Sequence, residues 1–326
     1  MLENLKQISQ PVESHLKDFD PYYKGVLKTD VTLLNLILRY MAKSKGKQIR
    51  PILVFLSAGA CGDISDRTYI GASMVELLHT ATLVHDDVVD RAESRRGIAS
   101  INAEWGNKIA VLAGDFLLSK GLSVAADNNE FDFLKFTSTA VRRMAEGELL
   151  GLDKGRKMDL EEETYFKIIA AKTASLISTC CKIGARSASD NEETVGKLGE
   201  YGENLGIAFQ LRDDIFDYTS RSSIIGKPIA NDIKEKKVTL PLIYSFKNGD
   251  QAEAKRIRSL IKKGNLSDKS VEEALAFVSE SGGVDYTKQT ALRYRDKAKE
   301  ALYSLPDSEF KNALNELADF VLTRKN

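Results

Sequence analysis

The sequence predicts an all-α protein that forms one large helical domain over residues 1–326. Only six prolines occur in the chain, so long segments run without a helix breaker. Apolar residues recur at helical spacing in one segment after another, whereas the alternation typical of β-strands is nowhere sustained. No change in composition along the chain marks a boundary between domains.

The predicted helices follow one another with short breaks. The helix predicted at residues 50–61 is apolar nearly all round, as in a buried helix. It begins near Pro51, and proline suits the first turn of a helix. Helix breakers cluster at Gly62-Asp63, Arg96-Gly97, residues 127–130 and, most heavily, residues 220–237. In chain order, helices are predicted at residues 31–43, 50–61, 67–90, 107–126, 132–152, 160–188, 192–220 and 238–249, and in two charged segments after residue 250.

Composition indicates a soluble protein, which we expect to be cytoplasmic. Hydrophobic residues make up 43% and charged residues 29%, as in globular proteins with a large core. The 47 basic and 47 acidic residues cancel, so we expect no nucleic acid to bind. Three cysteines are too few for a disulfide framework or zinc site and fit a reducing compartment. The N-terminus lacks a signal-peptide core, and no run approaches the roughly 18 apolar residues of a membrane span, so we expect no permanent anchor.

An aspartate motif, DDxxD, follows the apolar run that ends near residue 85. Asp86 and Asp90 are four residues apart, so on a helix they lie on one face about one turn of 5.4 Å apart, with Asp87 beside them. Such like charges repel, and aspartate is a poor helix former. A cation would offset this cost, and hard oxygen ligands suit Mg²⁺ shared with a phosphate. By itself, however, an Asp-rich helix end is more often solvated surface.

A second copy of the motif strengthens the metal hypothesis. Asp213, Asp214 and Asp217 have the same spacing and again follow an apolar helical segment. Two such motifs are improbable as solvated faces, and opposite each other in a helical bundle they could hold Mg²⁺ ions around one diphosphate. Gln210 lies one turn before Asp213, where it could bond to the ligands or the substrate, or be an ordinary surface amide.

Basic residues flank both motifs. Arg95 and Arg96 follow the first motif, and arginine suits bidentate phosphate contacts. Lys47 and Arg50 stand at a loop-to-helix entry, which can bind a second anion but alone would pass for a solvated charge cluster. His79 is a lone histidine on an apolar helix, usually a core residue, although it could donate to phosphate.

Further polar candidates occupy the second half of the chain. Lys172 and Thr173 are flanked by alanines, and Lys227 and Lys237 lie in the long segment rich in helix breakers. A loop of that length inside a compact helical domain is often a lid over a site.

These motifs together resemble the trans-isoprenyl diphosphate synthases, the family of farnesyl, geranylgeranyl and longer polyprenyl diphosphate synthases. The matching stretches run in family order from Gly46 to Ile243: GKQIRP, ELLHTATLVHDDVVDRAESRRG, AKTASL, AFQLRDDIFDYT and GKPIANDIKEKKVTLPLI. The resemblance implies a helical bundle of the isoprenoid synthase type with a central apolar cavity. It also implies a prenyltransferase that condenses isopentenyl diphosphate onto an allylic prenyl diphosphate.

The resemblance also assigns roles residue by residue. It implies three Mg²⁺ ions bound by five aspartates, with Asp214 close by: Asp86, Asp87, Asp90, Asp213 and Asp217. It implies that the allylic diphosphate contacts Arg95, Lys172 and Lys227, with help from Lys237. It implies a pocket for isopentenyl diphosphate made by Lys47, Arg50, His79 and Arg96. Thr173 and Gln210 match polar groups near the reacting carbons.

The sequence departs from the family in the segment after the second motif. The family commonly has G-x-D-x-x-x-G-K there, whereas this chain has ANDIKEKK, with Ala230 and Lys236 at the usual glycines. Asp232 and Lys237 are retained, so we expect an altered loop conformation and an intact site. In AEGELLGL, Glu148 and Gly151 occupy a stretch where related sequences often carry glutamine.

Product length follows from the face of the helix before Asp86. Ala81 and Thr82 are small, at the point where short-chain members typically place an aromatic plug. An open channel there predicts products longer than farnesyl, about thirty to fifty carbons, which would require peripheral membrane contact for release. Leu78, with Val75 and Met74, could line the channel, although any core helix shows such residues. Leu117 or Phe133 could form its floor.

Other interpretations remain open. A short-chain synthase would share these motifs. A class I terpene cyclase has one aspartate motif, but its second metal motif usually mixes Asn, Ser or Thr with acids. A non-catalytic partner subunit usually loses one of the motifs, and this chain keeps both. A helical scaffold with coincidental acid clusters predicts no Mg²⁺-dependent stabilisation by diphosphate.

We also expect a homodimer. The near-continuous apolarity of residues 108–126 suits an interface between two copies of the chain, although a central core helix would show the same pattern.

Overall fold

The computed structural model describes residues 2–43, 46, 48–155, 160–219, 230–264 and 266–324. Nearly all of these residues are helical. The α-helices are α1 Leu2–Ile8, α2 Glu13–Val26, α3 Thr32–Met41, α4 Ile49–Gly59, α5 Asp66–Val89, α6 Ile101–Trp105, α7 Asn107–Asp127, α8 Phe131–Gly155, α9 Glu162–Ile169, α10 Ser175–Ala188, α11 Glu192–Thr219, α12 Asn231–Lys234, α13 Leu240–Asn248, α14 Gln251–Lys263, α15 Asp268–Glu280, α16 Gly283–Ala301 and α17 Glu309–Thr323.

The all-α prediction is confirmed, although the structure adds helices that were not predicted, such as α1, α2, α6 and α12, and differs in further details. The predicted helix at residues 160–188 is α9 and α10 joined by a π-helical turn, η2 (Ala170–Ala174). The described residues after position 250 form four helices, α14 to α17, where two segments were predicted. A minimal antiparallel hairpin pairs β1 (Ser94–Arg95) with β2 (Ile98–Ala99). Near the N-terminus, a short 3₁₀ turn, η1 (Gln10–Val12), joins α1 to α2.

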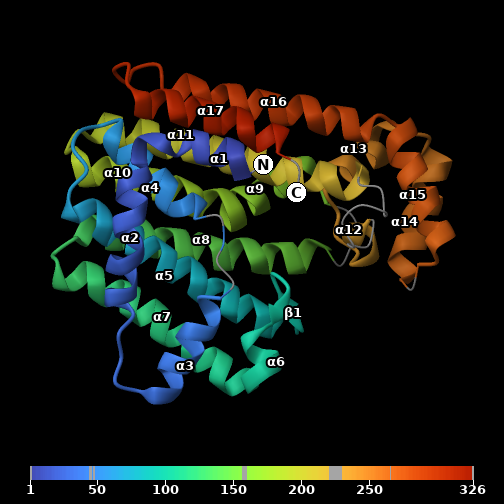
Figure 1. The fold of residues 1–326 in the computed structure, drawn as a ribbon. Helices are drawn as coiled ribbons and strands as arrows, with labels where there is room; N and C mark the ends of the chain where they lie inside the picture. The colour runs from blue at the N-terminus through green and yellow to red at the C-terminus, as the bar shows by residue number, and fades with distance from the viewer. Residues whose placement is uncertain are drawn as a thin grey trace.

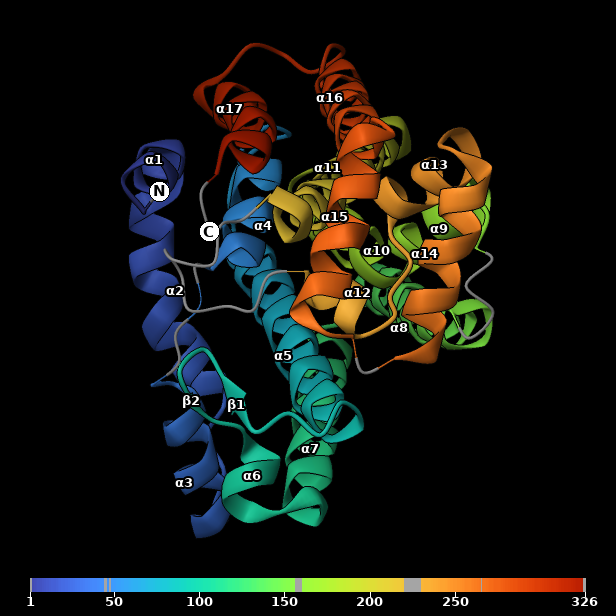
Figure 2. The same ribbon diagram turned by 90° about the vertical axis from the view of Figure 1, so that its right-hand side faces the viewer.

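The helices are layered around α5. Helices α4, α7 and α10 pack directly against α5, and α11 lies between α10 and α16. In Figure 1, α16 and α17 form one face of the molecule and α3, α6 and α7 form the opposite face. Figure 2 shows the molecule from the side where α12, α14 and α15 lie, with the hairpin beside α5.

Two apolar clusters make up most of the core. The larger joins α4, α5, α10, α11 and α17 around fully buried residues such as Phe55 and Tyr201. The smaller joins α9, α11 and α13 to α16 around Ile257 and Leu242. Helix α11 contributes to both clusters, which ties the C-terminal helices to the rest of the bundle.

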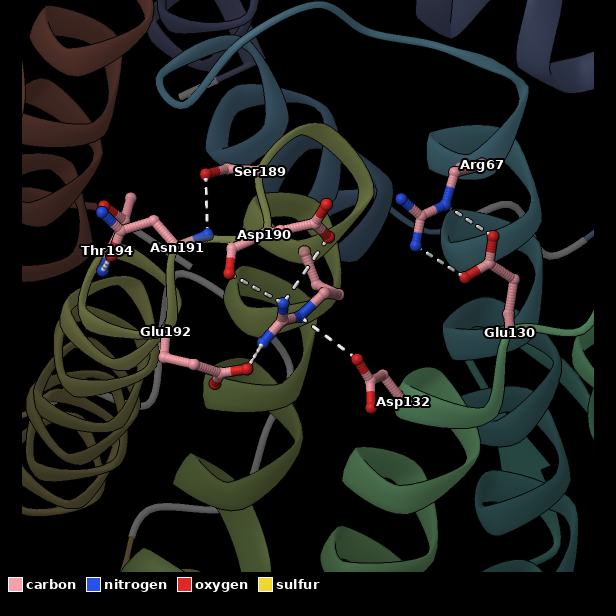
Figure 3. Close-up of polar contacts among 9 residues, drawn as sticks. Arg67, Glu130, Asp132, Ser189, Asp190, Asn191, Glu192 and Thr194 are labelled. Carbon is pink, nitrogen blue, oxygen red and sulfur yellow. Dashed lines mark hydrogen bonds and ion pairs between the residues drawn. The ribbon is translucent and has the colours of Figure 1, made fainter.

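Ion pairs close the end of the bundle at the N-terminus of α5 (Figure 3). Arg67 Nε lies 2.7 Å from Glu130 Oε1. The nearly buried Arg186 at the end of α10 forms ion pairs with three acids: Asp132, Asp190 and Glu192. Asp86 lies 20 residues after Asp66, the first residue of α5, so this end is roughly 30 Å from the start of the first aspartate motif.

Two helical segments are long and apolar enough, by length and composition alone, to cross a membrane: Asn107–Asp127 and Glu162–Ala188. Charged residues interrupt both segments, so neither contains an unbroken run of about 18 apolar residues. Core helices of soluble proteins meet the same test, and 61% of the tested window in the second segment is buried inside the protein.

Candidate active site

Both aspartate motifs stand at the C-terminal ends of their helices rather than in mid-helix. Helix α5 ends at Val89, and Asp90 is its C-cap residue. Asp213, Asp214 and Asp217 occupy the last two turns of α11. The negative end of a helix dipole disfavours carboxylates. The fold therefore concentrates acids where a bound cation stabilises them most.

The two acids at the start of the first motif have different surroundings. Asp87 is buried and bonds to the guanidinium of Arg95, with Arg95 Nη2 2.6 Å from Asp87 Oδ1. Asp86 keeps contact with solvent, but the protein around it partly desolvates its carboxyl and thereby raises its pKa. The positive charge of Lys172 opposes this shift, and the negative charge of Glu148 adds to it. Asp86 therefore faces α8 and the π-helical turn, whereas Asp87 anchors the hairpin.

The second motif is held by protein groups. Asp214 is buried, accepting a hydrogen bond from the Tyr165 hydroxyl and one from Gln210 Nε2 at 3.0 Å. Burial raises the pKa of Asp214 to about 6. Asp213 forms an ion pair with Arg324, just beyond α17. Asp217 Oδ2 accepts a hydrogen bond from the backbone N–H of Asp232 at 3.0 Å.

Two lysines lie within electrostatic range of the first motif. Lys172 forms an ion pair with Glu148 and acts electrostatically on Asp86. Burial disfavours the charged form of Lys237, but its hydrogen bond to Glu235 and the charges of Asp232 and Asp90 raise its pKa. Lys237, which follows the second motif, therefore lies within electrostatic range of the first.

The π-helical turn positions Lys172 and Thr173. Such turns are rare and frequent at functional sites, because the extra residue redirects side chains out of α-helical register. Thr173 Oγ1 donates a hydrogen bond to Gln210 Oε1 at 2.9 Å. The amide of Gln210 is thereby fixed between Thr173 and Asp214, so it is not a free surface amide.

The expected second anion site is also assembled, in part. Arg50, in the first turn of α4, is within electrostatic range of Glu76 and Arg96. Burial lowers the pKa of Arg50, and among the described residues its Nε has no hydrogen-bond partner. Burial and the arginines around it lower the pKa of His79 to about 2, so this imidazole is neutral. Lys47 and Lys227 lie outside the described residues.

The expected chain-length residues lie in packed core. Ala81 is buried with Leu38, Leu77 and Leu117, against α3 and α7. Leu78 is buried in the main core cluster, which also contains Met74, Val75 and Phe133. Thr82 Oγ1 donates to the carbonyl of His79 at 2.8 Å. A channel along this face stays a prediction.

A cavity of about 190 Å³ lies beside α5, toward α2, α3 and the hairpin. Its lining includes His79 and Thr80 from α5, together with Arg95 and Arg96.

The altered loop segment keeps the backbone that glycine favours. Ala230 has φ 56° and Lys236 has φ 59°, both in the left-handed region. Asp232 lies between them, and burial together with Asp217 and Asp214 raises its pKa to about 7. A left-handed backbone is costly for residues with a side chain, so Ala230 and Lys236 carry strain. The altered loop conformation expected from the sequence stays a prediction.

Three residues at the site escaped the sequence analysis. Tyr165 and Arg324 reach Asp214 and Asp213 from 49 and 111 residues away, and no local pattern marks such contacts. Glu76 lies three residues before His79, so helical spacing could have placed it on the same face.

The donor set fits magnesium shared with a substrate. Carboxylate oxygens are hard ligands of the kind that Mg²⁺ prefers. Among the residues that the structure describes, no three acidic, histidine or cysteine side chains form a ready metal site. Asp87, Asp213 and Asp214 each bond to another side chain instead. This arrangement suits ions that a diphosphate helps to coordinate better than an all-protein cage.

Comparisons with known proteins agree with this geometry. The profile of the polyprenyl synthetase family matches residues 31–278. The octaprenyl diphosphate synthase of Escherichia coli (strain K12) is 35% identical over 321 residues, covering 98% of this chain and 99% of the relative. The crystal structure of a decaprenyl diphosphate synthase from Rhodobacter capsulatus superposes with a TM-score of 0.92 at 32% identity, covering 98% of each chain.

The fold is also shared with a geranylgeranyl pyrophosphate synthetase from Pyrococcus horikoshii Ot3, with a TM-score of 0.90 at 31% identity. That match covers 98% of this chain and 99% of the other. The chain therefore belongs to the polyprenyl synthetase family and is a prenyltransferase.

Proposed function

We propose that the protein condenses isopentenyl diphosphate head-to-tail with an allylic prenyl diphosphate to make a long-chain all-trans polyprenyl diphosphate. The observation that carries this proposal is the approach of the two aspartate motifs beside a separate arginine-rich anion site. Lys237 lies within electrostatic range of Asp90 in the first motif and of Asp232, whose backbone N–H bonds to Asp217 in the second. Arg50 lies near Arg96 and His79.

Five aspartates would hold three Mg²⁺ ions with the allylic diphosphate: Asp86, Asp87, Asp90, Asp213 and Asp217. When bound, these ions neutralise the charge that develops on the leaving diphosphate. Lys172 and Lys237 add positive charge from the chain itself, and Arg95 aligns the site by fixing Asp87. Lys227 is proposed as a further contact to this diphosphate.

Isopentenyl diphosphate would bind to Arg50, Arg96 and His79, with Lys47 completing the pocket. The neutral imidazole of His79 can donate one N–H to a phosphate oxygen. Two separate anion sites hold the reacting carbons in line, and this positioning supplies much of the rate.

In the reaction, the allylic C–O bond breaks and the diphosphate leaves with the electron pair. The double bond of isopentenyl diphosphate then forms the new C–C bond, and a proton leaves to the departing diphosphate. Thr173 and Gln210 would position polar groups beside the reacting carbons, since each fixes the other.

For product length we propose thirty to fifty carbons. The small side chain of Ala81 supports this proposal, since no aromatic plug stands there. The test is to incubate the protein with isopentenyl diphosphate, Mg²⁺ and geranyl, farnesyl or geranylgeranyl diphosphate, and to size the dephosphorylated products by chromatography. Products of thirty carbons or more are expected, and Ala81→Phe should shorten them.

Accumulation at fifteen or twenty carbons would instead identify a short-chain synthase. Failure to form product with any primer would indicate a subunit that needs a partner.

We further propose that the protein is a homodimer that works in the cytoplasm and touches a membrane only to release its product. The dimer is supported by the exposed apolar face of α7, where Val111, Leu112 and Leu122 are 40%, 59% and 40% exposed.

A further inference from the structure

A chain of hydrogen bonds runs from α9 through the second aspartate motif to the π-helical turn. The hydroxyl of Tyr165 donates to Asp214 Oδ2, and Gln210 Nε2 donates to Asp214 Oδ1 at 3.0 Å. Thr173 Oγ1 donates to Gln210 Oε1 at 2.9 Å. Tyr165 and Asp214 are only 3% and 2% exposed, so little water reaches either of them. The four side chains therefore form one connected unit.

The carboxylate of Asp214 fixes the direction of each bond in this chain. A carboxylate only accepts hydrogen bonds, so the amide of Gln210 must turn its NH₂ group toward Asp214 and its oxygen toward Thr173. The amide oxygen also only accepts, so the hydroxyl of Thr173 must donate its single proton to Gln210. The Thr173 hydroxyl therefore offers any other neighbour only its oxygen lone pairs.

We propose that Tyr165 and Asp214 are positioning residues for the reaction. By holding Gln210 in one orientation, they make Thr173 present oxygen lone pairs to the allylic carbon as its bond to the diphosphate breaks. Lone pairs stabilise the positive charge that develops on this carbon, whereas a hydroxyl proton directed at it would oppose that charge. The inference rests on the proposed function, because it takes Thr173 to lie beside the allylic carbons.

The phenol of Tyr165 is needed because Asp214 is buried. Burial and the charge of Asp214 raise the pKa of Tyr165, so its hydroxyl keeps the proton that it donates. Without this hydroxyl, Asp214 Oδ2 would be a buried acceptor that has lost its partner. The carboxyl would then turn toward another donor and release the amide of Gln210.

Close packing sets the distance between the π-helical turn and α11. A Cβ atom on Gly206 would lie 2.5 Å from the Cα atom of Ala174, so only glycine allows the two backbones to approach this closely. Gly206 stands one turn before Gln210, and Ala174 directly follows Thr173. The contact therefore holds Thr173 within hydrogen-bonding distance of Gln210.

The first part of the test measures steady-state kinetics. Tyr165→Phe removes only the hydroxyl and should lower kcat roughly tenfold, with the KM for isopentenyl diphosphate within about twofold of wild type. In a Thr173→Val background the same change should lower kcat less than about twofold, because the hydroxyl that Tyr165 helps to orient is absent. A tyrosine that only stabilised the fold would lower kcat equally in both backgrounds.

The matched control is Tyr201→Phe. Tyr201 is also buried, and its hydroxyl donates to the backbone carbonyl of Leu314 at 2.7 Å within the larger core cluster. Both substitutions remove one buried hydrogen bond and should lower Tm by similar amounts, but only Tyr165→Phe should lower kcat. Should Tyr165→Phe fail to fold, Gln210→Met breaks the chain at its next link and should lower kcat in the same way.

The second part of the test needs no turnover. Titration calorimetry with Mg²⁺ compares two analogues of geranyl diphosphate that lack the allylic double bond. One carries a protonated tertiary amine in place of the branched carbon nearest the diphosphate, and the other keeps carbon there. Wild type should bind the amine on the order of tenfold more tightly, because the lone pairs of Thr173 face its positive charge. Tyr165→Phe should reduce this preference to less than about threefold, whereas Tyr201→Phe should preserve it.

Equal losses of kcat in the two backgrounds, an amine preference that survives Tyr165→Phe, or a wild type without that preference would overturn the inference. A wild type that makes no product, but whose preference for the amine depends on Tyr165, would count against the proposed function alone.

Discussion

At the residue scale, the site depends on carboxylates that the fold places where they are least stable without a cation. Asp86 and Asp90 lie at the negative end of α5, and Asp213 lies near the negative end of α11. In the absence of substrate, Arg95 and Arg324 supply positive charge to two of the motif acids. The acids therefore remain ordered, and they gain most from the arrival of ions with a diphosphate.

Removing a motif carboxylate should abolish most of the activity without unfolding the protein. We expect Asp86→Asn and Asp213→Asn each to lower kcat on the order of 10²–10³-fold, because each loses charge stabilisation of the leaving diphosphate. Steady-state kinetics with saturating Mg²⁺ measure this effect. Asp285→Asn is a control, since Asp285 is an exposed partner of Lys288 on α16 and should leave kcat unchanged. Wild-type kcat in Asp86→Asn would remove Asp86 from the metal site.

Two acids, Asp214 of the second motif and Asp232 beside it, should make the metal-free protein less stable as pH rises. Asp232 and Asp214 have pKa values of about 7 and about 6, above the ordinary value near 4, because burial disfavours their charged forms. The folded state thus retains protons that the unfolded state releases, so this contribution is complete below about pH 4 and is lost as pH rises to about 7.

Thermal unfolding in EDTA between pH 5 and 8 should therefore show a smaller loss of Tm in Asp232→Asn than in wild type. His79 acts in the opposite direction, because its lowered pKa costs stability below about pH 6.5. The comparison between wild type and variant cancels that contribution. Added Mg²⁺ with diphosphate should reverse the loss at high pH, since ions replace protons on the acids. Parallel pH profiles for both proteins would contradict the assignment.

At the scale of the elements, two short irregular segments shape the site. The hairpin of β1 and β2 carries Arg95 and Arg96 on a turn in which Arg96 and Gly97 both have positive φ, at 51° and 81°. The segment from Ala230 to Lys237 folds back on α11 through the backbone N–H of Ala230, which bonds to the carbonyl of Asp217. Both segments place a cation near the first motif.

Restoring glycine at position 236 should stabilise the protein. A left-handed conformation costs a residue with a side chain about 1–2 kcal/mol, and the greater freedom of glycine in the unfolded chain offsets part of this. We expect Lys236→Gly to raise the free energy of unfolding by roughly 0.5–1 kcal/mol, as measured by chemical denaturation. Ala230→Gly should be closer to neutral, because Ala230 is fully buried and loses a packed methyl group.

The matched control is Lys255→Gly on the exposed face of α14. This helical position lacks a positive φ, so the substitution should destabilise the protein by about 1 kcal/mol. Equal effects of Lys236→Gly and Lys255→Gly would show that the left-handed backbone carries no strain.

At the scale of the whole molecule, what could be predicted followed from local patterns. Apolar periodicity located the longer helices between residues 31 and 249 but not the short α6 and α12. The two DDxxD motifs located the acids. Both patterns repeat within a few residues, which is why the sequence alone reveals them. Contacts such as Arg324 with Asp213 join residues 111 positions apart and leave no local trace. The π-helical turn at Lys172 was missed because one extra residue per turn barely changes the apolar pattern. Packing of Ala81 against α7 depends on a neighbour that the sequence does not name.

The surface of the whole molecule leaves one long apolar helix incompletely covered, and this leads to the last prediction. In α7, which is apolar enough to pass for a membrane span, only 39% of the tested window is buried. An exposed apolar face of this kind is normally covered by another protein surface.

We expect the wild-type protein to have twice the mass of one chain by light scattering after size-exclusion chromatography. Leu112→Glu should give monomers, because a buried unpaired carboxylate disfavours association. Leu149→Glu, at an equally exposed leucine on α8, should remain dimeric. A monomeric wild type, or a dimer that tolerates Leu112→Glu, would mean that α7 is not the interface.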